Sequence, residues 1–430
     1  MNTEKLYLEF LNSSGVTTDS RNCPEGSVFF ALKGENFDGN KYAEDALRNG
    51  CRLAVVDNPA YAAKDCMLVG DCLTALQKLA NHHRKHSSCK VIALTGSNGK
   101  TTTKELIKSV LEKSYNVIAT EGNLNNHIGV PLTLLRITND TEIAVIEMGA
   151  NHQGEIALLT GIADPDIGLI TNIGKAHLEG FGSYEGVIKA KSELYKGMDQ
   201  SEKILFVNHD NSLLIELADQ VKAQKYYYGT DEGAVTTGKI LQSIPFLKIS
   251  FRDSKDKQFI ETDTHLVGAY NFENTMVAVS IGQYFNISGR LIAEAISQYH
   301  PSNNRSQLVE TVKNAVVNDF YNANPSSMEA ALLNFAGRKD DNKCVILGDM
   351  LELGDYAEEE HQKIIELLNQ LSLPYFLIGP LFSTIAGKAD NVFQNTDDFI
   401  SWIKIHPLEN KSILIKGSRG IRLEKIVRFL

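Results

Sequence analysis

Val91-Ile-Ala-Leu-Thr-Gly-Ser-Asn-Gly-Lys-Thr-Thr-Thr103 is the stretch of sequence that decides the fold of this chain. Its four leading apolar residues predict a buried strand, a turn with two glycines follows, and Thr101 to Leu111 has the composition and spacing of a helix. Glycines let backbone N–H groups approach an anion, and a helix N-terminus adds partial positive charge. The order of strand, turn and helix therefore predicts a phosphate-binding loop.

The residues of this loop predict how a nucleotide would be held. Lys100 can reach the β- and γ-phosphates, and the Thr101 hydroxyl can ligand Mg²⁺. An ordinary strand-to-helix turn also needs glycine, but strand, glycines, Lys-Thr and helix all occur here in order. The loop is two residues shorter between its glycines than the usual Gly-x-x-x-x-Gly-Lys-[Ser/Thr], which indicates a particular subclass of ATP users. The expected nucleotide-binding residues are Gly96, Ser97, Asn98, Gly99, Lys100, Thr101 and Thr102.

Size and composition limit the class of protein. A chain of 430 residues is long enough for two to four domains, and 43% hydrophobic with 22% charged residues is typical of a soluble globular protein. The sequence contains no apolar run near the roughly 20 residues that span a bilayer, so we expect no membrane insertion and a cytoplasmic protein. Six cysteines without Cys-x-x-Cys spacing predict reduced thiols, and a formal net charge of −10 argues against nucleic acid as the main partner.

Residues 1–88 are predicted to form a small α/β domain before the phosphate loop. Expected strands lie at 28–32 and 52–57, and a helix is expected at 72–86. On that helix His82 and His86 have metal-ligand spacing, but no third ligand lies nearby. We interpret both as cations at a helix C-terminus.

Two short segments of this first domain are candidates for binding an anion. Arg21 and Lys33 lie in polar or glycine-containing turns that suit a phosphate or diphosphate, and Phe30 or Phe37 could stack on a flat ring. Polar turns after short strands explain the same residues equally well, so both interpretations stay open. The candidate residues are Ser20, Arg21, Phe30, Lys33 and Gly34.

From residue 89 to 300 the pattern alternates strand and helix, as in a parallel sheet covered by helices on both faces. Ligands of such sheets collect at the carboxyl ends of the strands. Glu147 ends one buried run there and is the first candidate to hold Mg²⁺, while His177 follows another run and could hold a second metal or a phosphate. The expected strands are 90–95, 116–120, 143–147, 166–172, 203–207 and 226–229, and a β-rich segment follows at about 237–267.

Lys191 is the least ordinary residue of this central region. Val187, Lys191, Leu194 and Tyr195 share one helical face, so the Lys191 amine is expected to point inward. A Lys⁺ beside Mg²⁺ would cost on the order of 8 kcal/mol at 4 Å and an effective dielectric near 20. Either the side chain extends outward to a carboxylate such as Glu193 or Glu185, or its neutral amine has reacted with CO₂ to give a carbamate. The physics of the sequence alone favours the first alternative.

A helix is expected to begin near Asn271, and a third α/β unit is expected over residues 301–430. Asn271 and Asn274 share the first turn of that helix and could bind adenine or ribose, although an Asn there is equally a cap. The segment from His300 to Asn304 is predicted to be a polar linker before the third unit. Expected strands there are 306–311, 315–320, 343–348, 374–378 and 411–416, and the loops carry Arg305, residues 318–325, residues 347–354 and Lys416.

With these segments identified, the chain resembles the Mur ligases, ATP-dependent amide-forming enzymes of bacterial peptidoglycan synthesis. The resemblance runs the whole length and is carried by the short phosphate loop, Glu147-Met-Gly149, the loop around His177, Lys191 and Gly268 to Asn274. Within the family it is strongest for the members that add D-alanyl-D-alanine. Residues Tyr321-Asn-Ala-Asn-Pro325 and Leu347-Gly-Asp-Met350 carry that distinction.

The resemblance implies three α/β domains, with the UDP-sugar on the first, ATP on a central parallel-sheet domain, and the incoming dipeptide on a Rossmann-like third domain. A carboxylate of UDP-N-acetylmuramoyl-tripeptide would take the γ-phosphoryl group of ATP, and the amine of D-alanyl-D-alanine would displace phosphate. The enzyme is expected to act as a monomer with two Mg²⁺ ions. The implied metal ligands are Thr101, Glu147, His177 and Lys191 as its carbamate, the nucleotide residues are Asn271, Asn274, Arg305 and Asp319, and the peptide residues are Tyr321, Asn322, Asn324 and Lys416.

Two alternatives stay open at this point. One is a sister ligase, such as the enzyme that adds the third residue or a folylpolyglutamate-synthase-like enzyme, although the Asp-Asn-Pro-Arg type motif of the former is not found. The other is a nucleotide-binding regulatory protein that has lost ligation. Against it, Lys100, Glu147 and His177 are all present.

Overall fold

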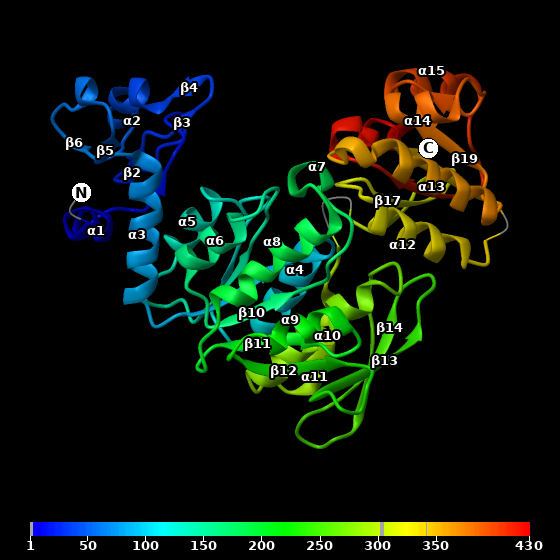
Figure 1. Cartoon of the computed structure of the whole chain (residues 1–430), viewed down its shortest axis with the longest axis horizontal. Helices are drawn as coiled ribbons and strands as arrows, with labels where there is room; N and C mark the ends of the chain where they lie inside the picture. The colour runs from blue at the N-terminus through cyan, green and yellow to red at the C-terminus, as the bar shows by residue number, and fades with distance from the viewer. Residues whose placement is uncertain (1–2, 302–304, 341) are drawn as a thin grey trace.

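The computed structural model describes residues 3–301, 305–340 and 342–430. Three sheets follow one another along the chain and mark three α/β domains. The first and third domains lie at opposite ends of the molecule, and both contact the central domain (Figure 1). The linker expected at His300 to Asn304 lies largely outside the described residues.

The first domain is a four-stranded parallel sheet in the order β1-β2-β5-β6. Its core is formed by β2 and β5, where every residue is buried. The predicted strands and the predicted helix at 72–86 are found. Its elements are α1 (Thr3–Leu11), β1 (Val16–Thr17), β2 (Val28–Phe30), the hairpin β3 (Lys33–Gly34) and β4 (Phe37–Asp38), α2 (Ala43–Arg48), β5 (Leu53–Val56), β6 (Cys66–Leu68) and α3 (Cys72–His86).

The central sheet has nine strands in the order β15-β14-β13-β12-β11-β10-β7-β9-β8. Strands β8 to β13 pair in parallel, and β14 and β15 extend the sheet as antiparallel strands. The expected strands and the β-rich segment are present, although β8 and β10 are each shorter than predicted. The strands are β7 (Lys90–Thr95), β8 (Val117–Ala119), β9 (Ile143–Glu147), β10 (Ile167–Ile170), β11 (Ile204–Asn208), β12 (Gln224–Gly229), β13 (Thr236–Gln242), β14 (Lys248–Arg252) and β15 (Phe259–Asp263).

Helices cover both faces of the central sheet, because β7 is apolar on both sides. Val91 and Ala93 belong to one hydrophobic cluster, and Ile92 and Leu94 belong to the other. Helices α4, α10 and α11 pack on the face that carries Ile92 and Leu94. Helices α6 and α8 pack on the face that carries Val91 and Ala93. The helices are α4 (Lys100–Leu111), α5 (Gly129–Leu134), α6 (Glu155–Ala163), α7 (Leu178–Phe181), α8 (Tyr184–Gly197), α9 (Ser212–Asp219), α10 (Asn271–Tyr284) and α11 (Gly289–Gln298).

The third domain has a six-stranded sheet in the order β16-β17-β21-β18-β19-β20, with only β16 antiparallel to its neighbour. All five predicted strands are found, and the two-residue strand β20 was not predicted because it is too short for a pattern. The elements are β16 (Gln307–Glu310), β17 (Ala315–Asp319), α12 (Pro325–Ala336), β18 (Lys343–Gly348), α13 (Ala357–Gln370), β19 (Tyr375–Ile378), α14 (Pro380–Ala386), β20 (Val392–Phe393), α15 (Thr396–Ile405) and β21 (Ser412–Lys416).

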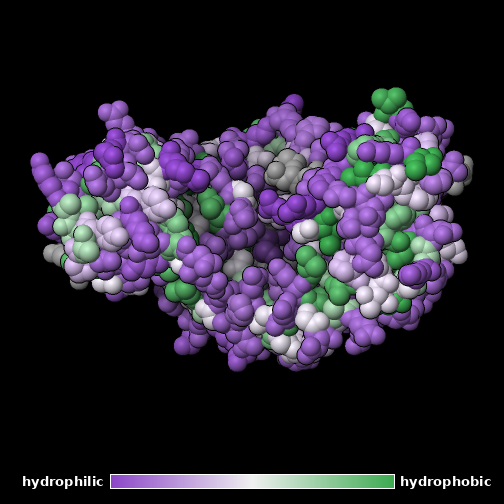
Figure 2. Space-filling model, turned by 90° about the horizontal axis from the view of Figure 1, so that it is seen from above, coloured by the Kyte–Doolittle hydropathy of each residue, from purple (hydrophilic) through white to green (hydrophobic). Residues whose placement is uncertain are grey.

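In the view from above, mostly hydrophilic side chains surround a hollow near the middle of the molecule (Figure 2). None of the helices within the described ranges is long and apolar enough to cross a membrane.

Candidate functional site

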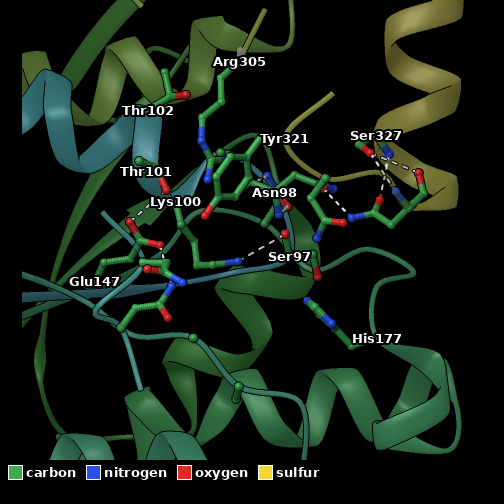
Figure 3. Close-up of a pocket in the computed structure, with 18 of the residues that line it drawn as sticks. Ser97, Asn98, Lys100, Thr101, Thr102, Glu147, His177, Arg305, Tyr321 and Ser327 are labelled. Carbon is green, nitrogen blue, oxygen red and sulfur yellow. Dashed lines mark hydrogen bonds between the residues drawn. The ribbon is translucent and has the colours of Figure 1, made fainter. Parts of the chain in front are cut away.

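A cavity of about 820 Å³ lies between the central and third domains. The phosphate loop and the ends of β9 and β10 supply one wall, and the loops that follow residue 305 supply the other (Figure 3). Side chains that the sequence places more than 200 residues apart therefore face one space. Predicted site residues on its lining are Ser97, Asn98, Gly99, Lys100, Thr101, Thr102, Glu147, His177, Asn271, Asn274, Arg305, Asp319, Tyr321, Asn322, Asn324 and Lys416.

The phosphate loop has room only for glycine at two positions. A Cβ on Gly96, whose φ is +151°, would lie 2.0 Å from Thr171 Oγ1, and a Cβ on Gly99, whose φ is +77°, would lie 2.4 Å from Asn274 Oδ1. The loop is thus packed closely against β10 and α10 and needs backbone conformations that glycine adopts freely. This packing fixes the direction in which the N-terminus of α4 faces the cavity.

Lys100 lies across the loop from which it arises. Its Nζ donates to the carbonyl oxygens of Gly96, at 2.6 Å, and Ser97, at 3.3 Å. Burial lowers the pKa of Lys100, the nearby Glu147 carboxylate opposes this shift, and the positive charge of Arg305 adds to it. The amine is placed to exchange these carbonyl contacts for an anionic ligand in the cavity.

Glu147 and Thr101 form a pair of oxygen donors at the carboxyl end of β9. Thr101 Oγ1 donates to Glu147 Oε2 at 2.9 Å, and Asn125 Nδ2 donates to Oε1 at 2.9 Å. The Glu147 side chain is buried. A hydroxyl beside one carboxylate fits Mg²⁺, which takes few protein ligands and completes its shell with water and phosphate oxygens. Among the described residues no three His, Cys, Asp or Glu side chains form a metal cluster.

Three residues that hold this site lie in segments expected at the ligand-binding edge of the sheet, but their individual roles were not predicted. Asn125 holds Glu147, while Asn172 and Thr171 hold Asn98: Asn172 Oδ1 accepts from the Asn98 N–H at 2.9 Å, and Thr171 Oγ1 donates to the Asn98 carbonyl at 2.6 Å. All three lie directly after a strand or in the loop that follows one, and this position is the signal in the sequence that could have identified them. Polar residues at the carboxyl ends of several parallel strands converge in space.

His177 lies in the loop after β10, with a left-handed backbone conformation (φ +52°). Its Nδ1 contacts the carboxylate of Glu352 of the third domain. The nearby His177 ring lowers the pKa of the Glu352 carboxyl, against the opposing effect of burial. His177 is therefore held at the boundary between the two domains.

Lys191 points inward on α8, as its place on the apolar face predicted, and is 1% exposed. Its Nζ lies 5.3 Å from the centroid of the Phe181 ring. Outward extension to Glu193 is wrong, because that carboxylate accepts from the N–H groups of Gly154 and Ala157 at the start of α6. Burial, and secondarily the charge of Lys100, lowers the pKa of Lys191 well below its usual value, against the opposing charges of Glu155 and Glu193. The cavity lining does not include Lys191.

Asn271 and Asn274 brace the phosphate loop. Asn274 Oδ1 accepts from Thr103 Oγ1 at 3.0 Å, its Nδ2 donates to Asn271 Oδ1 at 2.9 Å, and Asn271 Nδ2 donates to the Val267 carbonyl at 2.9 Å. Both amides are thus engaged within the protein. Their contact with a nucleotide stays a prediction.

The third domain presents cations and amides to the cavity. The Arg305 guanidinium lies 3.7 Å above the centroid of the Tyr321 ring, and its Nε is buried without a partner. Lys416 Nζ pairs with Asp319 Oδ2 at 2.6 Å, and Asn324 Nδ2 donates to Asn98 Oδ1 of the phosphate loop at 2.8 Å. The hydrogen bond between Asn324 and Asn98 joins the third domain directly to the phosphate loop.

The first-domain candidates divide into two groups. Ser20 and Arg21 line a second cavity of about 830 Å³ together with Phe37, Tyr42 and Arg48. Phe37 is 51% exposed and stacks on Tyr42. A stacking role for Phe30 is wrong, because Phe30 is a fully buried core residue of β2.

Lys33 and Gly34 lie on the short hairpin strand β3, outside the lining of this second cavity. Lys33 pairs with Asp57 at 2.7 Å. His82 and His86 belong to no group of three metal-ligating side chains in the described part of the chain.

Comparison with known proteins gives matches along the whole chain. Three family domains match in order: "Mur ligase family, catalytic domain" at residues 12–84, "Mur ligase middle domain" at 94–282 and "Mur ligase, glutamate ligase domain" at 304–419. The UDP-N-acetylmuramoyl-tripeptide--D-alanyl-D-alanine ligase of Bacillus subtilis (strain 168) is 36% identical, and the match covers 97% of this chain and 93% of that protein.

Two solved structures have the same arrangement of domains. The crystal structure of MurF from Acinetobacter baumannii superimposes with a TM-score of 0.88 at 30% identity, covering 99% of this chain and 97% of that one. MurF ligase from Thermotoga maritima in complex with ADP gives a TM-score of 0.85 at 26% identity over 98% and 97% of the two chains. On the identity and coverage of these relatives, together with the phosphate loop and the cavity it faces, the chain belongs to the Mur ligase family.

Proposed function

We propose that this protein is the ATP-dependent ligase that joins D-alanyl-D-alanine to UDP-N-acetylmuramoyl-tripeptide. The observation that carries the proposal is the single cavity in which Lys100 and Glu147 of the central domain face Arg305 and Tyr321 of the third. A reaction between a phosphoryl donor and two further substrates needs such a site, assembled from more than one domain. The names of the relatives supply the identity of the substrates.

The proposed chemistry has two balanced steps. The tripeptide carboxylate attacks the γ-phosphorus of ATP and releases ADP, which leaves an acyl phosphate. The dipeptide amine then attacks the acyl carbon, a proton leaves the nitrogen, and inorganic phosphate departs. In this scheme Lys100 and Arg305 neutralise the transferred phosphoryl group from opposite sides of the cavity, which is positioning and electrostatic catalysis.

Mg²⁺ would neutralise phosphate charge when bound, and the proposal gives one ion to Thr101 and Glu147. A second ion is proposed on Glu147, His177 and Lys191 as its carbamate. What supports the carbamate is the buried amine of Lys191, whose lowered pKa leaves the nitrogen lone pair free to attack CO₂ with release of a proton. Asn271, Asn274 and Asp319 are proposed to contact the nucleotide, and Tyr321, Asn322, Asn324 and Lys416 the dipeptide.

The second cavity, with Ser20 and Arg21, is proposed to hold the UDP part of the tripeptide substrate. We assign residues 1–88 to this domain, 89–300 to the ATP domain and 301–430 to the dipeptide domain. A monomer suffices, because one chain supplies every residue named. We place the reaction in the cytoplasm, which suits six cysteines that all carry free thiols.

Phosphate release from ATP in the presence of UDP-N-acetylmuramoyl-tripeptide, with and without D-alanyl-D-alanine, tests the proposal. We expect release only when both acceptor substrates are present, and a UDP-pentapeptide product by mass spectrometry. Turnover with a single amino acid in place of the dipeptide would assign a sister ligase. No turnover with any acceptor would favour a regulatory nucleotide-binding protein.

The carbamate has its own test. Lys191→Ala should lose ligation and regain part of it when short carboxylic acids are added, because these can replace the missing oxygen ligand. A Lys191→Ala variant that folds but shows no rescue would count against the carbamate and leave the ligase assignment intact.

A further inference from the structure

Glu352 is a third-domain residue whose carboxylate reaches a side chain of the central domain. It pairs with His177 Nδ1, and its backbone carbonyl accepts from the Glu179 N–H at 3.1 Å. Glu352 and His177 both line the cavity of the proposed active site. The contact therefore joins the two domains within the site itself.

The segment that carries Glu352 is held firmly in place. Glu352 has a left-handed backbone conformation (φ +64°), which an ordinary residue adopts only at a cost. The residues just before it are fixed: the Met350 N–H donates to His361 Nε2 at 3.0 Å, and the Leu351 N–H donates to Ser418 Oγ at 2.9 Å. A strained residue that directly follows fixed neighbours indicates that the position of this carboxylate matters.

His361 sets this arrangement from a buried position. Its Nδ1 bonds to the Ala357 carbonyl at 2.7 Å, and because Nε2 accepts from Met350, Nδ1 must be the protonated nitrogen. Asp349, next to Met350, accepts from the N–H groups of Leu381 and Phe382 at 2.9 Å each. The loop from Asp349 to Glu352 is thus tied to α13 and α14 of its own domain.

The contact with Glu352 also determines the state of the His177 ring. A carboxylate accepts but does not donate, so the proton of a neutral His177 lies on Nδ1. The lone pair then lies on Nε2, the nitrogen that is left to bind a cation. Carboxylates that hold metal-ligating histidines in this way fix the tautomer and the ring orientation, and losing one typically costs 10- to 100-fold in metal affinity.

We infer that Glu352 is a positioning residue that holds His177 as the Nε2-ligating tautomer, and that it does so only when the third domain is docked. The inference rests on the proposed metal role of His177. It couples metal binding in the central domain to the closure of the third domain through one side chain.

Mn²⁺ binding to the enzyme with ADP, followed by the EPR signal of free Mn²⁺, tests this inference without turnover. Glu352→Ala should weaken Mn²⁺ binding about 10-fold or more. Glu352→Gln should restore most of it, because the Gln Oε1 can still accept from Nδ1. Glu360→Gln is the matched control, since Glu360 pairs with Lys175 at 2.7 Å across the same interface without touching His177, and it should stay within about twofold of wild type.

A double-mutant cycle separates positioning from docking. If Glu352 acts through His177, then Glu352→Ala should have no further effect on Mn²⁺ binding in a His177→Ala background. Nitrogen-15 NMR of the histidines should also show the His177 tautomer lost in Glu352→Ala and kept in Glu360→Gln. Thermal unfolding shows whether each variant is folded before it is compared.

Three results would overturn the inference: wild-type Mn²⁺ affinity in a folded Glu352→Ala variant, an equal loss in Glu360→Gln, or a loss that persists unchanged without His177. Each leaves ligation of the dipeptide unaffected as a proposal. Conversely, an enzyme whose Mn²⁺ binding depends on His177 and Glu352 as expected, but which does not ligate D-alanyl-D-alanine, would reject the proposed function and keep the positioning role.

Discussion

The two outer domains are attached to the central domain in different ways. The first is attached by α3, a continuous helix that packs on both α1 and α6 and whose apolar face joins the hydrophobic cluster that also contains α5 and α6 residues. The third domain also contributes residues to this hydrophobic cluster, but it meets the central domain in addition through polar contacts, among them Asn324 to Asn98, Lys175 to Glu360 and His177 to Glu352.

This difference predicts which domain moves. Burial of apolar side chains is lost only when the whole helix separates, at about 25 cal/mol for each Å² exposed. Partly exposed ion pairs contribute 0–1 kcal/mol each and exchange readily with water. We therefore expect the first domain to stay fixed on the central domain while the third opens and closes, as substrate entry into the cavity requires.

The largest effect is expected from Leu79→Ala in α3. Leu79 is fully buried, and truncating a buried leucine costs about 2–5 kcal/mol because a cavity remains. Chemical denaturation should show this loss of unfolding free energy. The matched control is Leu333→Ala on α12 of the third domain, where the side chain is 49% exposed and a change within about 0.5 kcal/mol is expected.

Arg84→Met should lower the unfolding free energy by less than Leu79→Ala does. It should also weaken the attachment of the first domain to the central domain. Arg84 donates to Asp166 Oδ2 at 2.7 Å, and its side chain is only 10% exposed. Removing it leaves Asp166 with the Val91 N–H and Lys90, so we expect about 1–3 kcal/mol by denaturation. A loss as small as that of an exposed ion pair would contradict the view that α3 forms a rigid attachment.

The α3 attachment should also depend on pH through His83. Burial lowers the pKa of His83, and its Nε2 bonds to the Ile137 carbonyl at 2.8 Å. The unfolded chain binds the proton more readily, so this contribution is complete above about pH 6.5 and falls as the pH drops toward the folded-state pKa.

The slope can reach about 1.4 kcal/mol per pH unit for one proton. His83→Gln keeps a donor for Ile137 but does not titrate. The stability of this variant should therefore fall less than that of wild type between pH 7 and pH 5. Parallel curves for the two proteins would show that His83 does not titrate on unfolding.

The smallest effect on stability is expected at the third-domain interface. Lys175→Met removes the pair with Glu360, and because the Lys175 side chain is 43% exposed, at most about 1 kcal/mol should be lost. Small-angle scattering should nevertheless show a larger radius of gyration, since the open arrangement gains population. Lys363→Met, which removes the pairs with Glu359 and Glu360 within α13, is the control and should leave the scattering unchanged.

The sequence predicted most of the fold because its signals are local. Strand β7, the glycine turn and α4 are adjacent in the chain, and alternation of strands and helices over 90–300 and 306–416 follows from side-chain periodicity. The inward direction of Lys191 was predicted for the same reason: one helical turn relates it to Val187 and Leu194. The absence of a salt bridge between Lys191 and Glu193 was not predicted. The Glu193 carboxylate accepts from the N-terminus of α6, which lies elsewhere in the sequence.

What the sequence by itself determined is the phosphate loop, the strand-end carboxylate of Glu147 and the class of the three domains, since each depends on neighbouring residues. What only the tertiary structure decided is which distant groups meet. Phe30 proved to be core and Phe37 exposed, Asn125 was found to hold Glu147, and Glu352 was found on His177. Such contacts depend on how separate elements pack, and no local pattern of residues encodes the distance between side chains on different elements.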